Sequence, residues 1–355
     1  MNCSVLVGGF GETIELFKLS INLSAPEETR LNFVSSSKVG ENPSFLAVNS
    51  NGVYCVHEVS LFKGEKNGGF SFMKIDETNV IRKIQEQFSS GEDPTHVILN
   101  MKRSCAYISN YSSGHFAVTK IKENGLLGSC AYIESYDSGS GVVAERQKES
   151  HPHGACFKGK FVYCVDLGAD CVYHYVHGNG YEFNSPKAER TPTGPGSGPR
   201  HMVFHPRHKI AYLITELTNE IIIFKQNESN GSLAEVSRQN FLTSDLIEDG
   251  VTNYGSEIMV HPNGKYLYLS NRGNGALISY EISTEGDQLK RIETTRLVGT
   301  WPRHFNIHPS GKALLCADQF KNLIEVFYID DYTGKLRKVQ EVDCKNSPSC
   351  VIFKF

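Results

Sequence analysis

A proline-led motif recurs along this chain, and the recurrence limits the fold more than any other feature of the sequence. In its clearest copy, GPRHMVFHP at 198–206, an apolar run follows the proline and ends in a His-Pro turn, after which a second apolar run reaches Glu216. Related copies start at positions 43, 94, 152, 199, 255, 302 and 348. A spacing of about 50 residues is typical of the blades of β-propellers.

Each copy has the pattern of several short β-strands. The first apolar run meets a tight turn such as HPNGK at 261–265, where proline and glycine supply the backbone angles that a turn requires. A second apolar strand follows, and a third with alternating polar and apolar residues comes next, as at 323–327. Helical periodicity is sustained nowhere in the sequence, so the pattern predicts an all-β protein.

The two ends of the chain are expected to complete one blade together. The copy at 348 has room for a first strand only, whereas the N-terminal segments 4–9, 14–19 and 31–34 have the pattern of strands without a first strand before them. Pairing the two ends leaves no sheet edge open in the ring. We therefore predict one domain, residues 1–355, folded as a seven-bladed β-propeller of four-stranded antiparallel blades, with the last blade closed by the N- and C-terminal strands.

Charge and hydropathy exclude several classes of partner. The 36 Lys and Arg residues nearly balance the 39 Asp and Glu residues, so there is no basic excess to favour nucleic acid or a membrane surface. No apolar run is long enough to span a bilayer or to form a secretory signal. The ten cysteines form no C-x-x-C pair and mostly lie in apolar strands, which favours buried free thiols in a reducing compartment. A cytoplasmic protein is expected.

Two positions of the repeat are expected to meet at one mouth of the central channel, because the strands of a blade run antiparallel from the axis outward. The position after the proline holds, in chain order, Ser44, Thr95, His153, Arg200, Ser256, Arg303 and Ser349. The residue next to it is His96, His201, Glu257 or His304 in four of the copies. The position at the end of the second strand holds Glu58, Tyr111, Leu167, Glu216, Arg272 and Gln319.

These equivalent positions differ in charge, which indicates a chemically specialised mouth. Arginine stays protonated and offers planar donors, so Arg200, Arg272 and Arg303 suit a small anionic ligand or an oxyanion. A carboxylate among arginines, such as Glu216, should have a lowered pKa and be a weak base. His153 is predicted to titrate nearer neutrality. A non-catalytic propeller whose charges merely solvate the channel entrance is the simpler alternative.

Other chemistries have weaker support in the sequence. The pair His151 and His153 has no third ligand at a helpful spacing, so no metal site is predicted. No G-x-S-x-G motif, Walker motif or dinucleotide fingerprint is present, and no cofactor is expected. The recurring His205, His261 and His308 are assigned to turn stability, and His151 to ordering a loop. Residues 191–199 are predicted to form a loop beside the mouth.

In combination, several segments resemble the seven-bladed lactonase family. They are the stretch from 198 to 217, RQKE at 146–149 leading to His153, VDLG at 165–168, SNRG at 270–273 and WPR at 301–303. That family contains bacterial-type 6-phosphogluconolactonases and the fungal carboxy-cis,cis-muconate lactonising enzyme. By position, the resemblance assigns the family's active-site residues to His153, Arg200, Glu216 and Arg272. It also includes Arg146 in the binding region.

The resemblance implies metal-independent hydrolysis of an anionic sugar lactone similar to 6-phosphogluconolactone. Arginines would bind the anion and stabilise the carbonyl oxygen, and either Glu216 or His153 would activate water. The residues predicted to bind substrate are Arg303, His201, Glu58, His96, Glu257 and Arg146. Ring closure of a carboxymuconate at the same site and metabolite or protein binding without turnover remain alternatives. The expected protein is a monomer or weak homo-oligomer.

Overall fold

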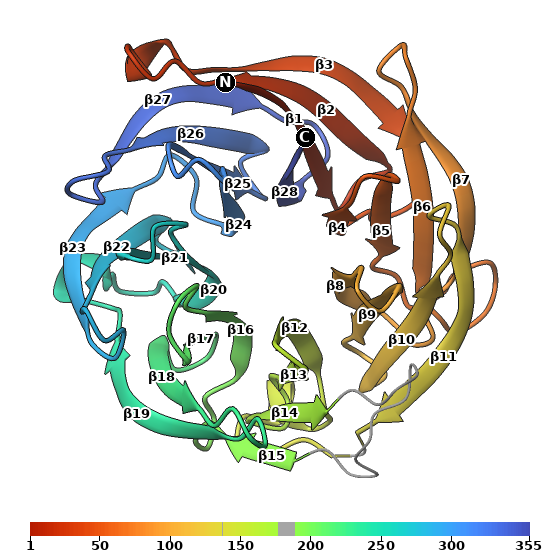
Figure 1. Ribbon diagram of the computed structural model, residues 1–355. Helices are drawn as coiled ribbons and strands as arrows, with labels where there is room; N and C mark the ends of the chain where they lie inside the picture. Colours follow the sequence, from red (N-terminus) through yellow and green to blue (C-terminus); the bar gives the residue numbers. More distant parts are fainter. Residues whose placement is uncertain (137, 177–188) are drawn as a thin grey trace.

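The computed structural model describes residues 1–136, 138–176 and 189–355 and forms a closed ring of seven antiparallel sheets (Figure 1). In the six sheets built from consecutive strands, the first strand lies beside the central channel and the fourth lies at the circumference. This arrangement confirms the predicted seven-bladed β-propeller. It also confirms the four-stranded blades.

Six blades are formed by consecutive strands, and their bounds follow in chain order from the innermost strand outward. The first two blades are β4 (Phe45–Val48), β5 (Val53–His57), β6 (Gly69–Ile75) and β7 (Ile81–Phe88), and β8 (Pro94–Asn100), β9 (Cys105–Asn110), β10 (His115–Ile121) and β11 (Leu127–Ser135). The third and fourth are β12 (Pro152–Lys158), β13 (Phe161–Asp166), β14 (Cys171–Val176) and β15 (Glu189–Pro192), and β16 (Pro199–Phe204), β17 (Ile210–Thr215), β18 (Glu220–Gln226) and β19 (Leu233–Asn240). The fifth and sixth are β20 (Tyr254–Val260), β21 (Tyr266–Arg272), β22 (Ala276–Ile282) and β23 (Leu289–Arg296), and β24 (Pro302–Ile307), β25 (Ala313–Asp318), β26 (Leu323–Ile329) and β27 (Leu336–Asp343).

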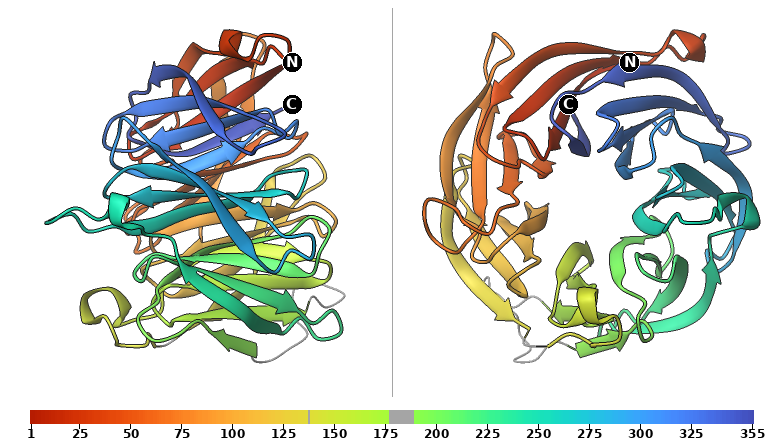
Figure 2. Two further views of the ribbon diagram at one scale, coloured as in Figure 1. Left: turned by 90° about the vertical axis from the view of Figure 1, so that its left-hand side faces the viewer. Right: turned by 180° about the vertical axis from the view of Figure 1, so that it is seen from behind.

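The seventh blade joins the two ends of the chain, as predicted. The C-terminal strand β28 (Pro348–Lys354) is innermost and pairs with β1 (Asn2–Gly9), which pairs in turn with β2 (Thr13–Ser20) and then β3 (Arg30–Lys38). The described helices are short: η1 (Pro26–Glu28), α1 (Ala144–Gln147) and η2 (Ser244–Leu246). Seen from the side, α1 and the segment around η2 protrude from the same face of the ring (Figure 2).

A buried tyrosine of the second strand links neighbouring blades. The hydroxyl groups of Tyr54, Tyr163, Tyr212 and Tyr268 donate hydrogen bonds of 2.6–2.9 Å to backbone carbonyls of glycines in the outer turn of the following blade. These glycines, at 125, 231, 286 and 334, have positive φ, which most side chains disfavour. The tyrosine rings bury large apolar surfaces between the sheets, and each hydroxyl retains a hydrogen-bond partner.

The recurrent histidines stabilise turns, as predicted. The Nε2 atom of His205 lies 2.8 Å from the carbonyl of Gly264, and that of His261 lies 2.8 Å from the carbonyl of Gly311, so each joins its turn to the turn of the next blade. His308 differs because its Nδ1 atom contacts the hydroxyl of Ser310 within its own turn.

One backbone hydrogen bond recurs where the second strand returns to the channel. The amides of Glu58, Tyr111, Leu167, Glu216 and Gln319 each donate to the carbonyl of the residue just before or near the start of the first strand of the same blade, at 2.7–3.0 Å. The two repeat positions therefore meet at one mouth in these five blades, as the strand pattern predicted.

Candidate active site

A cavity of about 360 Å³ occupies the mouth of the channel. It is within the size range of small-molecule sites. It is lined by Glu58, Thr95, Tyr111, Arg146, His153, Glu216, Tyr254, Arg272, Trp301 and Arg303. Six of the ten residues assigned to the site from the sequence line it: His153, Glu216, Arg272, Arg303, Glu58 and Arg146.

Glu216 is the centre of the charged network at the mouth. Its Oε1 atom lies 2.5 Å from Arg146 Nη2, and its Oε2 atom lies 2.7 Å from Arg272 Nη2 and 3.3 Å from Arg200 Nε. Burial raises the pKa of the Glu216 carboxyl, but Arg272, Arg200 and Arg146 together outweigh this effect and hold that pKa well below its usual range. Glu216 is therefore an ionised anchor for three guanidinium groups and a weak base.

The three arginines around Glu216 differ in their access to the cavity. The Arg146 side chain is 34% exposed, whereas those of Arg272 and Arg200 are only 5% and 4% exposed. Arg200 lies beneath the mouth, where its Nη1 atom donates a 2.7 Å hydrogen bond to the carbonyl of Ser256. Burial and the neighbouring Arg272 lower the pKa of the Arg200 guanidinium. Arg200 thus orients Glu216 from below.

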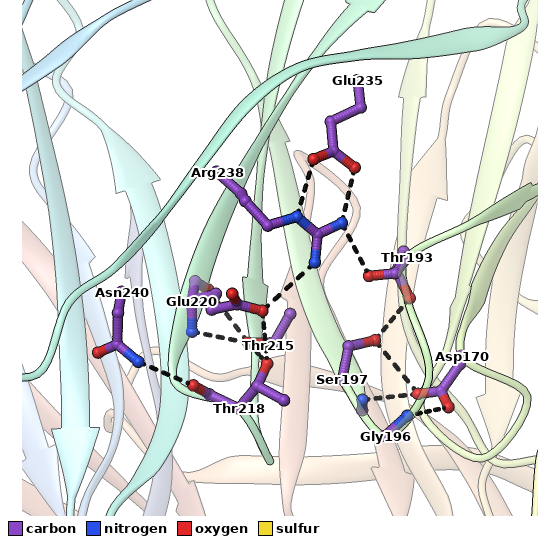
Figure 3. A network of polar contacts seen from close by, with 11 residues as sticks. Asp170, Thr193, Gly196, Ser197, Thr215, Thr218, Glu220, Glu235, Arg238 and Asn240 are labelled. Carbon is purple, nitrogen blue, oxygen red and sulfur yellow. Dashed lines mark hydrogen bonds and ion pairs between the residues drawn. The ribbon is translucent and has the colours of Figure 1, made fainter. Parts of the chain in front are cut away.

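A buried aspartate anchors both segments that supply this network. Asp170 Oδ1 accepts hydrogen bonds from Gln147 Nε2 at 2.6 Å and from the amide of Gly198 at 2.8 Å, while Oδ2 accepts one from the amide of Gly196 at 2.7 Å. Figure 3 shows this carboxylate beside the loop that leads to β16. Gln147 belongs to α1, which carries Arg146. The carbonyl of Gly198 accepts a hydrogen bond from the amide of Glu216. The predicted loop at 191–199 begins and ends in strands, because Thr191 and Pro192 belong to β15 and Pro199 to β16.

Replacing Asp170 with asparagine should disturb both segments that it anchors, α1 and the loop before β16. One carboxylate oxygen becomes an NH2 group that faces backbone donors, so we expect a stability loss of about 3 kcal/mol and a fall in activity. Chemical denaturation measures the first effect. The matched control is Asp330→Asn, because Asp330 accepts similar backbone hydrogen bonds in an exposed turn. Equal stability of the two variants would contradict the anchoring role of Asp170.

Aromatic side chains form one wall of the mouth, and the sequence reasoning did not identify them as site residues. The guanidinium carbon of Arg272 lies 5.7 Å from the ring centre of Tyr254 and 5.4 Å from that of Trp301. Both rings line the cavity. Tyr254 and Trp301 come one position before the repeat starts at 255 and 302, and His151 comes one before the start at 152. An aromatic residue directly before the start of a repeat was the sequence signal that could have identified these site residues.

His151 orders the loop that leads into β12, as predicted. Its ring stacks on Tyr111 at 4.3 Å between centroids, and its Nδ1 atom lies 2.8 Å from the Tyr111 carbonyl. His153 points into the mouth, but the prediction that it titrates near neutrality is wrong. Burial, together with Arg200 and other nearby cationic groups, lowers its pKa well below the usual value, so the imidazole is neutral at pH 7.

His96, His201 and Glu257 do not line the mouth cavity, contrary to the expected convergence. With His304 and Phe45 they line a second cavity of about 160 Å³ deeper in the channel. The first strands β8, β16 and β20 each carry a register irregularity near their start, and His96, Glu257 and His201 lie farther along these strands than the mouth residues. Glu257 Oε2 lies 2.9 Å from His201 Nδ1 and 3.4 Å from His304 Nε2.

The described residues include no group of three or more His, Cys, Asp or Glu side chains arranged to hold a metal ion. All ten cysteines are free, and eight of them are buried, as expected from the sequence. In the part of the chain that the structure describes, no helix has the length and hydropathy needed to cross a bilayer.

The protein is thus a seven-bladed propeller with an arginine-rich cavity at one mouth of its channel. The family model "Lactonase, 7-bladed beta-propeller" matches residues 5–353. The chain is 30% identical over 348 residues to the 6-phosphogluconolactonase of Bacillus subtilis, covering 97% of this chain and 95% of that one. It is 31% identical over 323 residues to the 6-phosphogluconolactonase of Formosa agariphila, covering 88% of this chain and 89% of that one.

Solved structures agree with these sequence matches. A Bacteroides uniformis protein, solved as a candidate 6-phosphogluconolactonase, superposes with a TM-score of 0.87 at 28% identity and covers 99% of both chains. The periplasmic gluconolactonase of Pseudomonas aeruginosa shares the fold with a TM-score of 0.85 at 24% identity, over 99% of both chains. The present chain belongs to the seven-bladed β-propeller lactonase family.

Proposed function

We propose that this protein hydrolyses a phosphorylated sugar lactone of the 6-phosphogluconolactone type to the open acid. The observation that carries the proposal is the charge of the mouth, where Arg146, Arg272 and Arg303 line the cavity with two carboxyl groups and Arg200 lies directly beneath. Such a site favours a polyanion. The family and the names of the two curated relatives support the same reaction and favour it over ring closure of a carboxymuconate.

The arginine side chains differ in exposure, and this difference supports a separate role for each of them. Arg146 and Arg303, with side chains 34% and 20% exposed, would hold the phosphate at the rim. Arg272 would stabilise the negative charge that grows on the carbonyl oxygen, and buried Arg200 would keep Glu216 and Arg272 aligned. Neutral His153 would hydrogen-bond the attacking water or the ring oxygen. In this proposal His153, Glu216, Arg200 and Arg272 form the catalytic group.

The residues that line the second cavity lie below the mouth, so we assign them a supporting role and not substrate binding. His96, His201 and Glu257 would support the mouth from below, with His201 packed edge-on against His153 at 5.2 Å between ring centroids. Binding without turnover, the alternative from another class of protein, predicts stabilisation by the lactone and no release of acid.

The test is a turnover assay on 6-phosphogluconolactone, unphosphorylated gluconolactone and 3-carboxymuconate. We expect the phosphorylated lactone to have a kcat/KM about 100-fold above that of the unphosphorylated lactone, because charge-assisted hydrogen bonds to the phosphate are lost in the latter. Arg303→Gln should reduce this ratio, because one rim guanidinium is removed. Turnover of carboxymuconate alone, or of none of the three, would contradict the proposed function.

We further propose that the protein acts in the cytoplasm as a monomer or weak homo-oligomer. The buried free thiols fit a reducing compartment. Light scattering at micromolar concentration tests the oligomeric state.

A further inference from the structure

Glu58 is a second carboxyl group at the mouth, and its backbone is fixed on both sides. It follows β5 directly; its amide donates to the carbonyl of Asn42 at 3.0 Å, and its carbonyl accepts from Asn42 Nδ2 at 3.0 Å. Its side chain is 15% exposed and lines both the mouth cavity and the narrow space beneath it, as His153 does. Glu58 can therefore meet a ligand at the base of the mouth.

The two carboxyl groups differ in how fully they are paired. Both oxygens of Glu216 contact guanidinium groups, at distances down to 2.5 Å. The ion pair of Glu58 with Arg303 Nη2 has a length of 3.7 Å, which is too long for a hydrogen bond. Arg303 also lies over the ring of Phe10, with 4.8 Å between the guanidinium carbon and the ring centre. A water molecule can thus compete for an oxygen of Glu58 far more easily than for one of Glu216.

The charged groups around Glu58 act in opposite directions. Burial is the largest effect and raises the pKa of the Glu58 carboxyl, as Asp93 does, whereas Arg303, the Ser44 hydroxyl and Arg200 lower it; the net pKa is raised. Neutral His153 faces the same space from β12. A carboxyl with a raised pKa inside an arginine-rich cavity binds a proton more strongly than an ordinary glutamate does, which suits a group that accepts a proton and then returns it.

We propose that Glu58, and not Glu216, is the carboxylate that accepts and returns the proton during lactone hydrolysis. The inference rests on the proposed function and names a further catalytic residue for it. Glu58 takes a proton from water while the water oxygen bonds to the lactone carbonyl carbon, and the carbonyl oxygen becomes an oxyanion beside the arginines. The intermediate then breaks its bond from the carbonyl carbon to the ring oxygen, and Glu58 returns the proton to that oxygen. The product acid ionises by releasing a proton to solvent.

The experiment compares Glu58→Gln with the wild type across pH 4 to 9 and measures kcat, KM and the melting temperature. We expect kcat to fall about 1,000-fold, within the range of general acid–base catalysis, while KM changes much less. In the wild type kcat/KM should fall as pH drops through the pKa of Glu58, and this acidic limb should be absent from the residual activity of the variant. Small carboxylates such as formate should partly rescue Glu58→Ala. Glu86→Gln, on the outer strand β7 of the same blade, is the control.

Melting temperature separates this role from a structural one. The carboxyl pKa is raised above its unfolded value of about 4.5, so the folded state loses stability as pH rises through the interval between the two values. At pH 8 Glu58→Gln should therefore melt at or above the wild-type temperature although it is inactive.

Three results would overturn the proposal. An active wild type with a fully active Glu58→Gln variant overturns the role of Glu58 alone. An inactive variant that melts well below the wild type and is not rescued by formate assigns Glu58 a structural role instead. A wild type that turns over no lactone overturns this proposal together with the proposed function.

Discussion

Substitution of Glu216 by glutamine is expected to lower the stability of the propeller and its lactonase activity together. The carboxylate is buried and contacts Arg146, Arg200 and Arg272, so its removal leaves three guanidinium groups close together without their shared anion. Breaking a buried ion pair from one side costs about 3–5 kcal/mol. The melting temperature should fall by roughly 5–10 °C for that loss. We expect kcat/KM to fall about 100-fold, because the repelling arginines no longer hold one geometry.

Calorimetry and lactone turnover measure the two effects of Glu216→Gln. Glu235→Gln is the matched control, because Glu235 pairs with Arg238 at 2.6 Å on the outer strand of the same blade, where a partly exposed pair contributes little. A variant with the wild-type melting temperature would contradict the central position of Glu216 in the network. A stable variant with full activity would also remove Glu216 from the proposed catalytic group.

The pH dependence of this effect follows from the direction of the shift. The folded pKa of Glu216 is held below its unfolded value of about 4.5, so its stabilising contribution is complete above that value and is lost as pH falls toward the folded pKa. The stability difference between the wild type and Glu216→Gln should therefore narrow below pH 4.5. The difference should stay constant between pH 6 and 8.

The fold was predictable because its determinants are repeated along the chain. The proline and the two apolar runs recur in most blades, and a turn histidine recurs in three of them, so the repeated residues have closely similar structural roles from copy to copy. The shared blade was predictable for the same reason, since a ring leaves an unmatched half-repeat at each end of the chain. The pairing of β1 with β28 provides the closure that this mismatch required.

The site was predictable in part, because charged residues at repeat positions stand out against their equivalents. The depth of each residue along the channel could not be predicted from the repeat. Thr95 and His96 are adjacent in sequence, yet only Thr95 lines the mouth, because the strand carries His96 to a deeper layer. Glu216 pairs with Arg146 of α1, which is 70 residues away in a segment outside the repeat, so the repeat pattern could not show this contact. The pKa of His153 depends on burial and on cationic neighbours from other blades, which no single repeat displays.

Replacement of Arg272 by lysine is expected to reduce kcat/KM about 100-fold while the charge of the mouth is kept. The guanidinium group lies against Tyr254 and Trp301 and donates through Nη2 to Glu216 Oε2 at 2.7 Å and to the Gly255 carbonyl at 2.9 Å. An ammonium group lacks the planar face that stacks on the rings and the fork that serves several acceptors. Loss of one well-aimed donor to a growing oxyanion costs on the order of 3 kcal/mol in the transition state.

Two substrates distinguish the possible roles of Arg272. If it stabilises the carbonyl oxygen, Arg272→Lys should slow phosphorylated and unphosphorylated gluconolactone by the same factor, since both develop that charge. If it binds the phosphate instead, only the phosphorylated lactone should slow. Arg291→Lys is the matched control, because Arg291 also lies over a tyrosine, Tyr280, but on the outer strand β23 of the same blade. Wild-type kcat/KM for Arg272→Lys on both lactones would mean that position 272 needs only a positive charge.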